Sequence, residues 1–137
     1  MRGMSDNDRA HADRRLKGDL IIWLTTVNAE GQPQTSPVWF WWDGEAVLMF
    51  SMPRSPKVAN IRANPRVSLN LDGNGQGGDI VSIEGTVEMF DTPLTEFPEY
   101  VQRYADKLKA MGYEPDPFAH AYSVGIRVVP TRFRVYI

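Results

Sequence analysis

"PVWFWW" (residues 37–42) places four consecutive aromatic side chains just before an Asp-Gly turn signal. A strand with one face in water alternates apolar and polar residues, but this stretch is apolar on both faces. Alternation puts Trp39 and Trp41 on one face. Phe40 and Trp42 then point to the other. One pair is expected to fill the core and the other to face a second subunit or a flat ligand, with core packing on both sides as the alternative.

Strand signals continue on both sides of this stretch. Runs rich in β-branched and aromatic residues, separated by Gly, Pro and Asn turns, predict six strands. These strands are expected at 19–27, 34–42, 46–51, 66–72, 80–90 and 124–137. Gly85 inside the fifth run predicts a bulge. Antiparallel strands joined in meander or Greek-key order predict a mainly β fold with flanking helices, and a small closed or split barrel removes the exposed sheet edges.

Helical signals lie between and before the strands. The helices are expected at 7–17, 55–65 and 96–111. Ser55 suits an N-cap and Pro56 the first helical position of the middle helix. The last helix has apolar residues at spacings of three and four, which gives it one apolar face, and Thr95 is its expected cap. Residues 114–122 are expected to form a loop or a short helical turn.

Composition limits the classes of function. The chain has no cysteine, which excludes disulfides, thiolate catalysis and thiolate metal sites. Its net charge of −2 gives no global attraction to nucleic acid or membrane. Residues 1–19 lack the apolar core of a signal peptide, and no apolar run could span a membrane. A single cytoplasmic domain, residues 1–137, without nucleic-acid or membrane partners is therefore expected.

The segment "SMPRSPK" (residues 51–57) joins a predicted strand to a helix N-terminus. Backbone N–H groups and the helix dipole favour negative charge there. Arg54 and Lys57 are therefore unfavourable by about 0.3–1 kcal/mol each unless an anion binds between them. Ser51 and Ser55 add hydroxyl donors. The segment is a candidate phosphate site, and the alternative is a solvated Arg and Lys beside an ordinary Ser-Pro cap.

Other polar residues form no recognisable catalytic or metal-binding pattern. His11 and His120 lie far apart and belong to no HxxxH or HExxH motif, and GxSxG is absent. The glycine-rich run at 73–78 precedes no helix, so a hairpin loop is the better interpretation. Arg132 and Arg134 share a strand face, where they keep an edge soluble or meet an acidic ligand tail. We therefore predict no metal site and name no catalytic residue.

The order of these motifs resembles that of the pyridoxamine 5′-phosphate oxidase-like split barrels. The resemblance rests on "GQPQTSPVWFWWDGEAVLMFS" (31–51) and "RSPKVANIRANPRVSLNLD" (54–72), and residues 80–90 and 126–137 fit as well. More narrowly, the chain is similar to the actinobacterial branch of F420-dependent flavin/deazaflavin oxidoreductases. Each fragment is degenerate, but together they are specific and cover nearly the whole chain.

The resemblance implies a homodimeric split β-barrel, like the FMN-binding proteins, with cofactors in grooves at the subunit interface. By position, the cofactor phosphate would be held by Ser51, Met52, Arg54, Ser55 and Lys57. The flat ring system would be lined by Ser36, Pro37, Val38 and Trp39. In this family the cofactor carries the hydride chemistry while the protein orients it and excludes water.

The implied function is an F420H2-dependent oxidoreductase that transfers a hydride between the deazaflavin and a small unsaturated or quinone-like molecule. An FMN-dependent oxidoreductase is one alternative. A non-catalytic barrel that holds a cofactor, heme or bilin is another. The C-terminal segment with which the full oxidase recognises pyridoxal phosphate is absent, so a vitamin B6 substrate is not expected.

Overall fold

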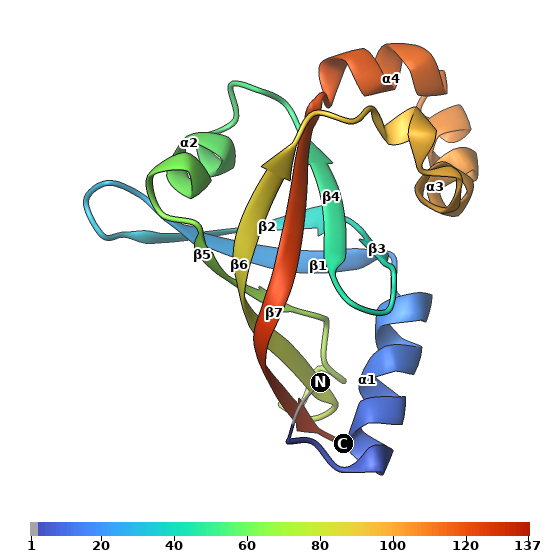
Figure 1. Ribbon diagram of the computed structural model, residues 1–137. Helices are drawn as coiled ribbons and strands as arrows, with labels where there is room; N and C mark the ends of the chain where they lie inside the picture. The colour runs from blue at the N-terminus through green and yellow to red at the C-terminus, as the bar shows by residue number, and fades with distance from the viewer. Residues whose placement is uncertain (1–2) are drawn as a thin grey trace.

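The computed structural model describes residues 3–137, which form one curled antiparallel sheet with flanking helices (Figure 1). The strands are β1 (Ile21–Val27), β2 (Pro33–Trp39), β3 (Trp41–Trp42), β4 (Val47–Ser51), β5 (Arg66–Asn70), β6 (Ile80–Phe90) and β7 (Val124–Tyr136). Their order across the sheet is β2-β1-β5-β6-β7-β4-β3. The predicted mainly β split barrel is confirmed.

One predicted strand is in fact two. The run 34–42 breaks at Phe40, so that Trp39 pairs with Ile21 of β1 while Trp41 pairs with Leu48 of β4. The strands β2 and β3 are the two opposite edges of the sheet, joined by this single residue. The sheet therefore has seven strands rather than the six predicted, and the split in the barrel lies within the aromatic run.

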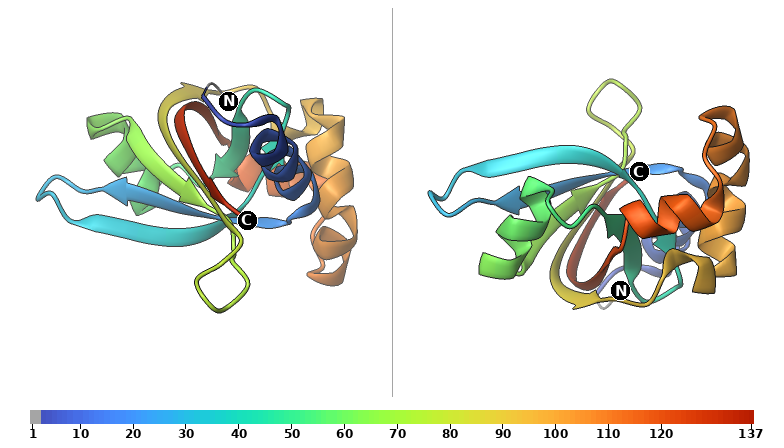
Figure 2. Two further views of the ribbon diagram at one scale, coloured as in Figure 1. Left: turned by 90° about the horizontal axis from the view of Figure 1, so that it is seen from below. Right: turned by 90° about the horizontal axis from the view of Figure 1, so that it is seen from above.

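Five helical segments surround the sheet: α1 (Asp6–Gly18), α2 (Pro56–Ala63), the 3-10 turn η1 (Leu94–Glu96), α3 (Pro98–Ala110) and α4 (Pro115–Ala121). The helices α3 and α4 lie together at one side, away from the projecting β1–β2 hairpin (Figure 2). Thr95 does not cap α3, because it lies in η1 and Phe97 takes the cap position. Ser55 does take the cap position of α2, but its side chain makes no capping hydrogen bond.

Helix α3 secures the break at Phe40. The Phe40 N–H donates to the Tyr104 hydroxyl at 2.7 Å, and the Phe40 carbonyl accepts from that hydroxyl at 2.7 Å and from Arg103 Nε at 3.1 Å. The Tyr104 hydroxyl also lies 2.8 Å from the carbonyl oxygen of Leu20. Buried backbone polar groups need partners, and Phe40 has no strand neighbour to supply them. The helix therefore holds the chain where it crosses from one sheet edge to the other.

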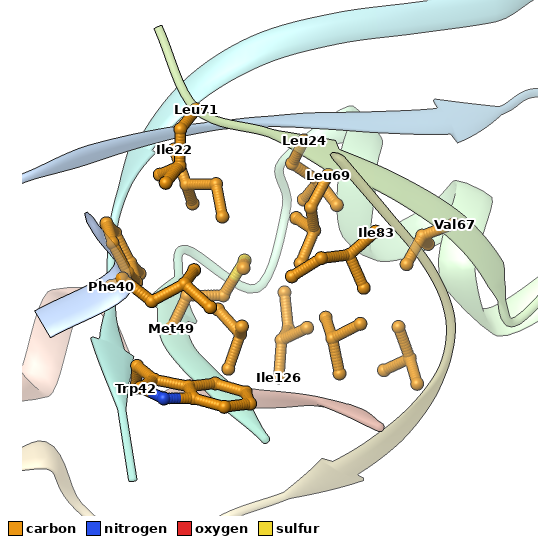
Figure 3. Close-up of a cluster of buried hydrophobic side chains, with 14 of the residues drawn as sticks. Ile22, Leu24, Phe40, Trp42, Met49, Val67, Leu69, Leu71, Ile83 and Ile126 are labelled. Carbon is orange, nitrogen blue, oxygen red and sulfur yellow. The ribbon is translucent and has the colours of Figure 1, made fainter. Parts of the chain in front are cut away.

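Alternation within the aromatic run is confirmed by two separate clusters of buried side chains. Phe40 and Trp42 point into the barrel core among aliphatic side chains such as Ile22, Leu69 and Ile126 (Figure 3). Trp39 and Trp41 instead pack against a second cluster of buried side chains. That cluster is formed by Phe50, Leu94, Tyr100, Tyr104, Leu108 and Phe118. One face of the run thus fills the barrel, and the other is covered by α3 and α4.

The predicted bulge at Gly85 is confirmed. The register between β6 and β7 shifts between Glu84 and Gly85. A Cβ on Gly85 would lie 2.6 Å from the Val128 side chain and 2.9 Å from the Val129 carbonyl oxygen. The close approach of the two strands therefore requires glycine.

An ionic cluster attaches α1 to the loop between β5 and β6. His11 Nε2 lies 2.6 Å from Asp79, and Arg15 pairs with Asp79 at 2.8 Å and with Asp19 at 2.7 Å. The interaction with His11 is the largest of those that hold the Asp79 pKa below its ordinary value. Across residues 3–137, no helix has the length and apolar character needed to cross a membrane.

Candidate functional site

Two neighbouring cavities share one wall residue, Lys57, at the start of α2. The first, of about 320 Å³, is polar and lies between β1, β2 and α2. It is lined by Thr26, Gln34, Ser36, Ser55 and Asn60, among others. The second, of about 310 Å³, is lined by the aromatic residues Trp39, Phe50, Tyr100, Phe118 and Tyr122, together with Lys57. We call them the polar cavity and the aromatic cavity.

Seven of the nine predicted site residues line these two cavities. Ser36, Ser55 and Lys57 line the polar cavity, and Pro37, Val38, Trp39, Ser51 and Lys57 line the aromatic one. The remaining two, Met52 and Arg54, are exposed and line neither. Two segments that the sequence separates, 36–39 and 51–57, therefore meet at one place in the fold.

Larger hollows lie elsewhere on the molecule. One of about 500 Å³ is lined by side chains of α1, β3 and α3, and one of about 540 Å³ runs along β1, β5 and β6. Neither is lined by any of the nine predicted residues. The polar and aromatic cavities are smaller, but they alone among these four bring the predicted residues together.

Lys57 is the electrostatic feature of the site. Its side chain is half-buried, and burial lowers its pKa below the ordinary lysine value. Within residues 3–137 it forms no ion pair, and the first turn of α2 carries no acidic residue. A partly desolvated cation without a counter-ion, at a helix N-terminus, is a favourable place for an anion.

Hydroxyl groups accompany this cation. Ser51 Oγ and Ser55 Oγ lie 3.3 Å apart, at the end of β4 and the start of α2. Because Ser55 makes no capping bond, its hydroxyl can turn toward a ligand without leaving the helix less capped than it already is. The site therefore offers a cation, two hydroxyls and the N-terminal end of a helix within one short segment.

The wall of the polar cavity is held by Asn60, which is not among the nine site residues predicted from the sequence. Its Nδ2 donates to Thr26 Oγ1 and Gln34 Oε1, both at 2.9 Å. These bonds tie α2 to β1 and β2. The signal in the sequence was its position three residues after Lys57, which places both side chains on one face of the helix.

The aromatic cavity differs from the expectation in how Trp39 meets it. The Trp39 ring stacks on Tyr104 at 4.6 Å and 6°, and on Phe118 at 5.7 Å and 22°. Two of the protein's own rings therefore stack on the indole, which is only partly exposed and so leaves only part of its surface for a ligand. Phe118 in turn stacks on Tyr122 at 4.2 Å. Phe118 and Tyr122 of this cavity lie in the segment expected as a loop or short helical turn, and Tyr100 of α3 was not singled out in the sequence.

The histidines stay apart from this site. His11 belongs to the α1 cluster, and His120 lines a separate hollow beside Asp91 and Asp116. Among the residues that the structure describes, no three His, Asp or Glu side chains are grouped to hold a metal ion. The chemical resources of the two cavities are thus positive charge, hydroxyl groups and flat apolar surface.

The fold and the two cavities define a class: an antiparallel barrel split at one residue, with a polar and an aromatic cavity along the split. The chain belongs to the pyridoxamine 5′-phosphate oxidase family, whose sequence model matches residues 9–135. The resemblance drawn from the motifs is confirmed.

Several solved structures are similar. One named F420 reductase is 31% identical with a TM-score of 0.74, and the match covers 89% of this chain and 94% of that one. A conserved hypothetical protein from Mycobacterium tuberculosis is 26% identical with a TM-score of 0.72, covering 97% and 84%. A FAD-binding protein from Mesorhizobium loti, at 21% identity, TM-score 0.68 and coverage of 95% and 92%, shows likeness of fold alone. The comparison with curated protein sequences found no match.

Proposed function

We propose that this protein is an oxidoreductase that binds coenzyme F420 across the two cavities and reduces a small unsaturated or quinone-like molecule. One observation carries the proposal: Lys57 is a half-buried cation without a counter-ion among residues 3–137, placed where the polar and aromatic cavities meet. A phosphorylated cofactor with a flat ring has the matching parts. The 31% identity with a structure named F420 reductase supports the deazaflavin over other flavin-type cofactors.

In this proposal the phosphate lies at the start of α2. Lys57 neutralises it, and the Ser51 and Ser55 hydroxyls donate hydrogen bonds to its oxygens. Arg54, exposed just before the helix, adds long-range attraction and approaches from the solvent side. Asn60 keeps the cavity wall in place through its bonds to β1 and β2.

The ring system then enters the aromatic cavity. A volume of about 310 Å³ is at the lower end for ligand sites, which suits flat ring systems more than a bulky ligand. The aromatic walls exclude water from the reacting atoms, and Trp39 bounds the ring laterally. When bound, the cofactor supplies the hydride chemistry, and the chain's own residues bind and orient it.

A homodimer with the cofactor at the subunit interface is part of the same proposal. The edge strand β2 borders both cavities, yet Pro33, Gln34 and Thr35 are exposed on it. An edge strand left open in this way is a surface that a second chain can cover. The second subunit would complete the wall of the groove.

The phosphate assignment is tested by the double variant Arg54→Ala/Lys57→Ala. Removing both charges is expected to weaken F420 and FMN binding at least about tenfold, or about 1.4 kcal/mol, because a charge-assisted contact in a half-buried site is lost. The measurement is a titration followed by tryptophan fluorescence. The matched control is Lys107→Ala/Lys109→Ala, which removes the same charge from exposed positions of α3. Equal affinity of the double variant and the control would contradict the assignment.

A further inference from the structure

The hydroxyl of Tyr100 has no partner in the part of the chain that the structure describes. Tyr100 is 3% exposed, and no hydrogen bond to its hydroxyl is formed by any residue from 3 to 137. Tyr104, one turn further along α3, has its hydroxyl within 2.8 Å of three backbone atoms. Within the same part of the chain, no fully buried side-chain N or O atom lacks a partner. The Tyr100 hydroxyl must therefore belong to the small part of this side chain that remains accessible to solvent.

Of the five hollows described above, Tyr100 lines the aromatic cavity alone, so we assign its accessible part to that cavity. Its ring is fixed by an edge-to-face contact with Phe50 at 4.9 Å and a tilted contact with Tyr104 at 5.1 Å. Packing of this kind leaves the ring little freedom to turn its hydroxyl elsewhere. The other polar side-chain groups of the cavity are the Ser51 and Tyr122 hydroxyls, the Lys57 ammonium and the Trp39 indole N–H.

The hydroxyl is held in its protonated form. Burial raises the pKa of Tyr100 far above the ordinary tyrosine value, and the neighbouring Tyr104 and Tyr122 add to the shift, while Arg103 opposes it. A neutral phenol in an apolar pocket is a hydrogen-bond donor. Leaving such a donor unpaired when a ligand displaces water costs free energy, so a ligand with a matching acceptor is selected.

We propose that the Tyr100 hydroxyl donates a hydrogen bond to a carbonyl oxygen of a flat, conjugated ligand in the aromatic cavity. This inference rests on the proposed function, in which two ligands carry such an oxygen: the substrate and the ring of the cofactor. The shared chemistry is a carbonyl group conjugated to a ring or double bond.

For a substrate, the contact has a direct chemical use. Adding a hydride to the β carbon of an unsaturated carbonyl compound forms a C–H bond and shifts the C=C electron pair toward the carbonyl group. Negative charge then develops on the carbonyl oxygen, which takes a proton from water when the product leaves the cavity. A donor already aimed at that oxygen stabilises the charge as it develops. The electrons come from the reduced deazaflavin of the proposed function.

Tyr100→Phe tests the inference by ligand binding. Menadione carries conjugated carbonyl groups, and 2-methylnaphthalene has the same ring frame without them. The preference of the wild-type protein for menadione is expected to fall about three- to tenfold in the variant, as for loss of one hydrogen bond. The infrared carbonyl band of bound menadione is expected at lower frequency in the wild type than in the variant. An unchanged melting temperature shows that the variant is folded.

The two sources of the carbonyl group give different results. If the acceptor is on the cofactor, F420 affinity falls by the same factor and the preference for menadione stays. If it is on the substrate, the menadione preference and the infrared shift are lost while F420 affinity stays. The inference is overturned if neither changes, or if the losses follow the control Tyr122→Phe in the same cavity instead. The naphthalene pair needs no F420, so its outcome is separate from a failure of the wild type to bind that cofactor.

Discussion

The crossing at Phe40 depends on a single hydroxyl group, and Tyr104→Phe removes it. The substitution keeps the ring and its stacking on Trp39 at 4.6 Å. It takes away the acceptor of the Phe40 N–H, which is buried and has no strand partner. It also removes the donor to the carbonyl oxygens of Phe40 and Leu20, although Arg103 Nε still reaches Phe40 at 3.1 Å.

The expected loss in the free energy of unfolding follows from these contacts. An unsatisfied buried N–H costs about 1–3 kcal/mol, and the lost donated bond adds about 0.5–1.5 kcal/mol, so the free energy of unfolding should fall by about 1.5–4.5 kcal/mol. At an unfolding entropy of about 2.1 cal/mol/K per residue, a chain of 137 residues has about 0.29 kcal/mol/K. The melting temperature should therefore fall by about 5–16 °C.

Urea denaturation and thermal unfolding, followed by circular dichroism, measure this change. Tyr100→Phe is the matched control, because it removes a hydroxyl of the same helix that has no partner among the described residues. Its free energy of unfolding should stay within about 0.5 kcal/mol of the wild type. If the two variants are equally stable, the hydroxyl of Tyr104 does not stabilise the crossing at Phe40.

Two further predictions concern the cofactor groove. Because burial lowers the pKa of Lys57, the unfolded chain binds more protons at this site between the lowered and the ordinary value, so the stability of the free protein rises with pH there. A bound phosphate favours the charged lysine, so F420 affinity should fall as pH rises through the lowered pKa of Lys57. Fluorescence titrations at several pH values should show this fall in the wild type. An equal fall in Lys57→Met would refute the role of Lys57. The proposed homodimer predicts twice the mass of the chain by light scattering at micromolar concentration, and the mass of one chain would contradict an interface groove.

Much of the architecture could be predicted from local patterns. Strand composition, turn residues and the Ser-Pro pair before α2 are read over a few residues each, and they placed six strand regions and the segment 51–57 correctly. Gly85 predicted the bulge between β6 and β7 in the same way. Patterns of this kind work where the local preference and the final structure agree.

The break at Phe40 could not be found in this way. No glycine, proline or polar residue marks it, because the chain leaves one sheet edge and joins the other without a turn. The hydrogen bonds that permit the break come from Tyr104 and Arg103, more than sixty residues later. These two side chains replace the missing strand neighbour of Phe40. Because they are distant in the sequence, a local pattern cannot predict their contact with Phe40.

The aromatic cavity was only half predicted for a similar reason. The β2 side of the cavity, Pro37 to Trp39, was expected, but its other walls come from α3 and α4. The apolar face of α3 has the same spacing whether it fills a core or borders a cavity. Phe118 and Tyr122 lie in a segment whose short length gave no clear period. Only the structure shows that the Tyr104 hydroxyl has hydrogen-bond partners, whereas the Tyr100 hydroxyl has none among residues 3–137.

The proposed function requires that a phosphorylated deazaflavin occupies both cavities at once. A titration of the wild-type protein with F420, FMN and riboflavin, followed by tryptophan fluorescence, tests it most directly, since Trp39 borders the aromatic cavity. F420 should bind most tightly and quench strongly, and riboflavin, which lacks the phosphate that Lys57 is proposed to hold, should bind at least about tenfold more weakly. If F420 binds no tighter than riboflavin, the proposed function is wrong.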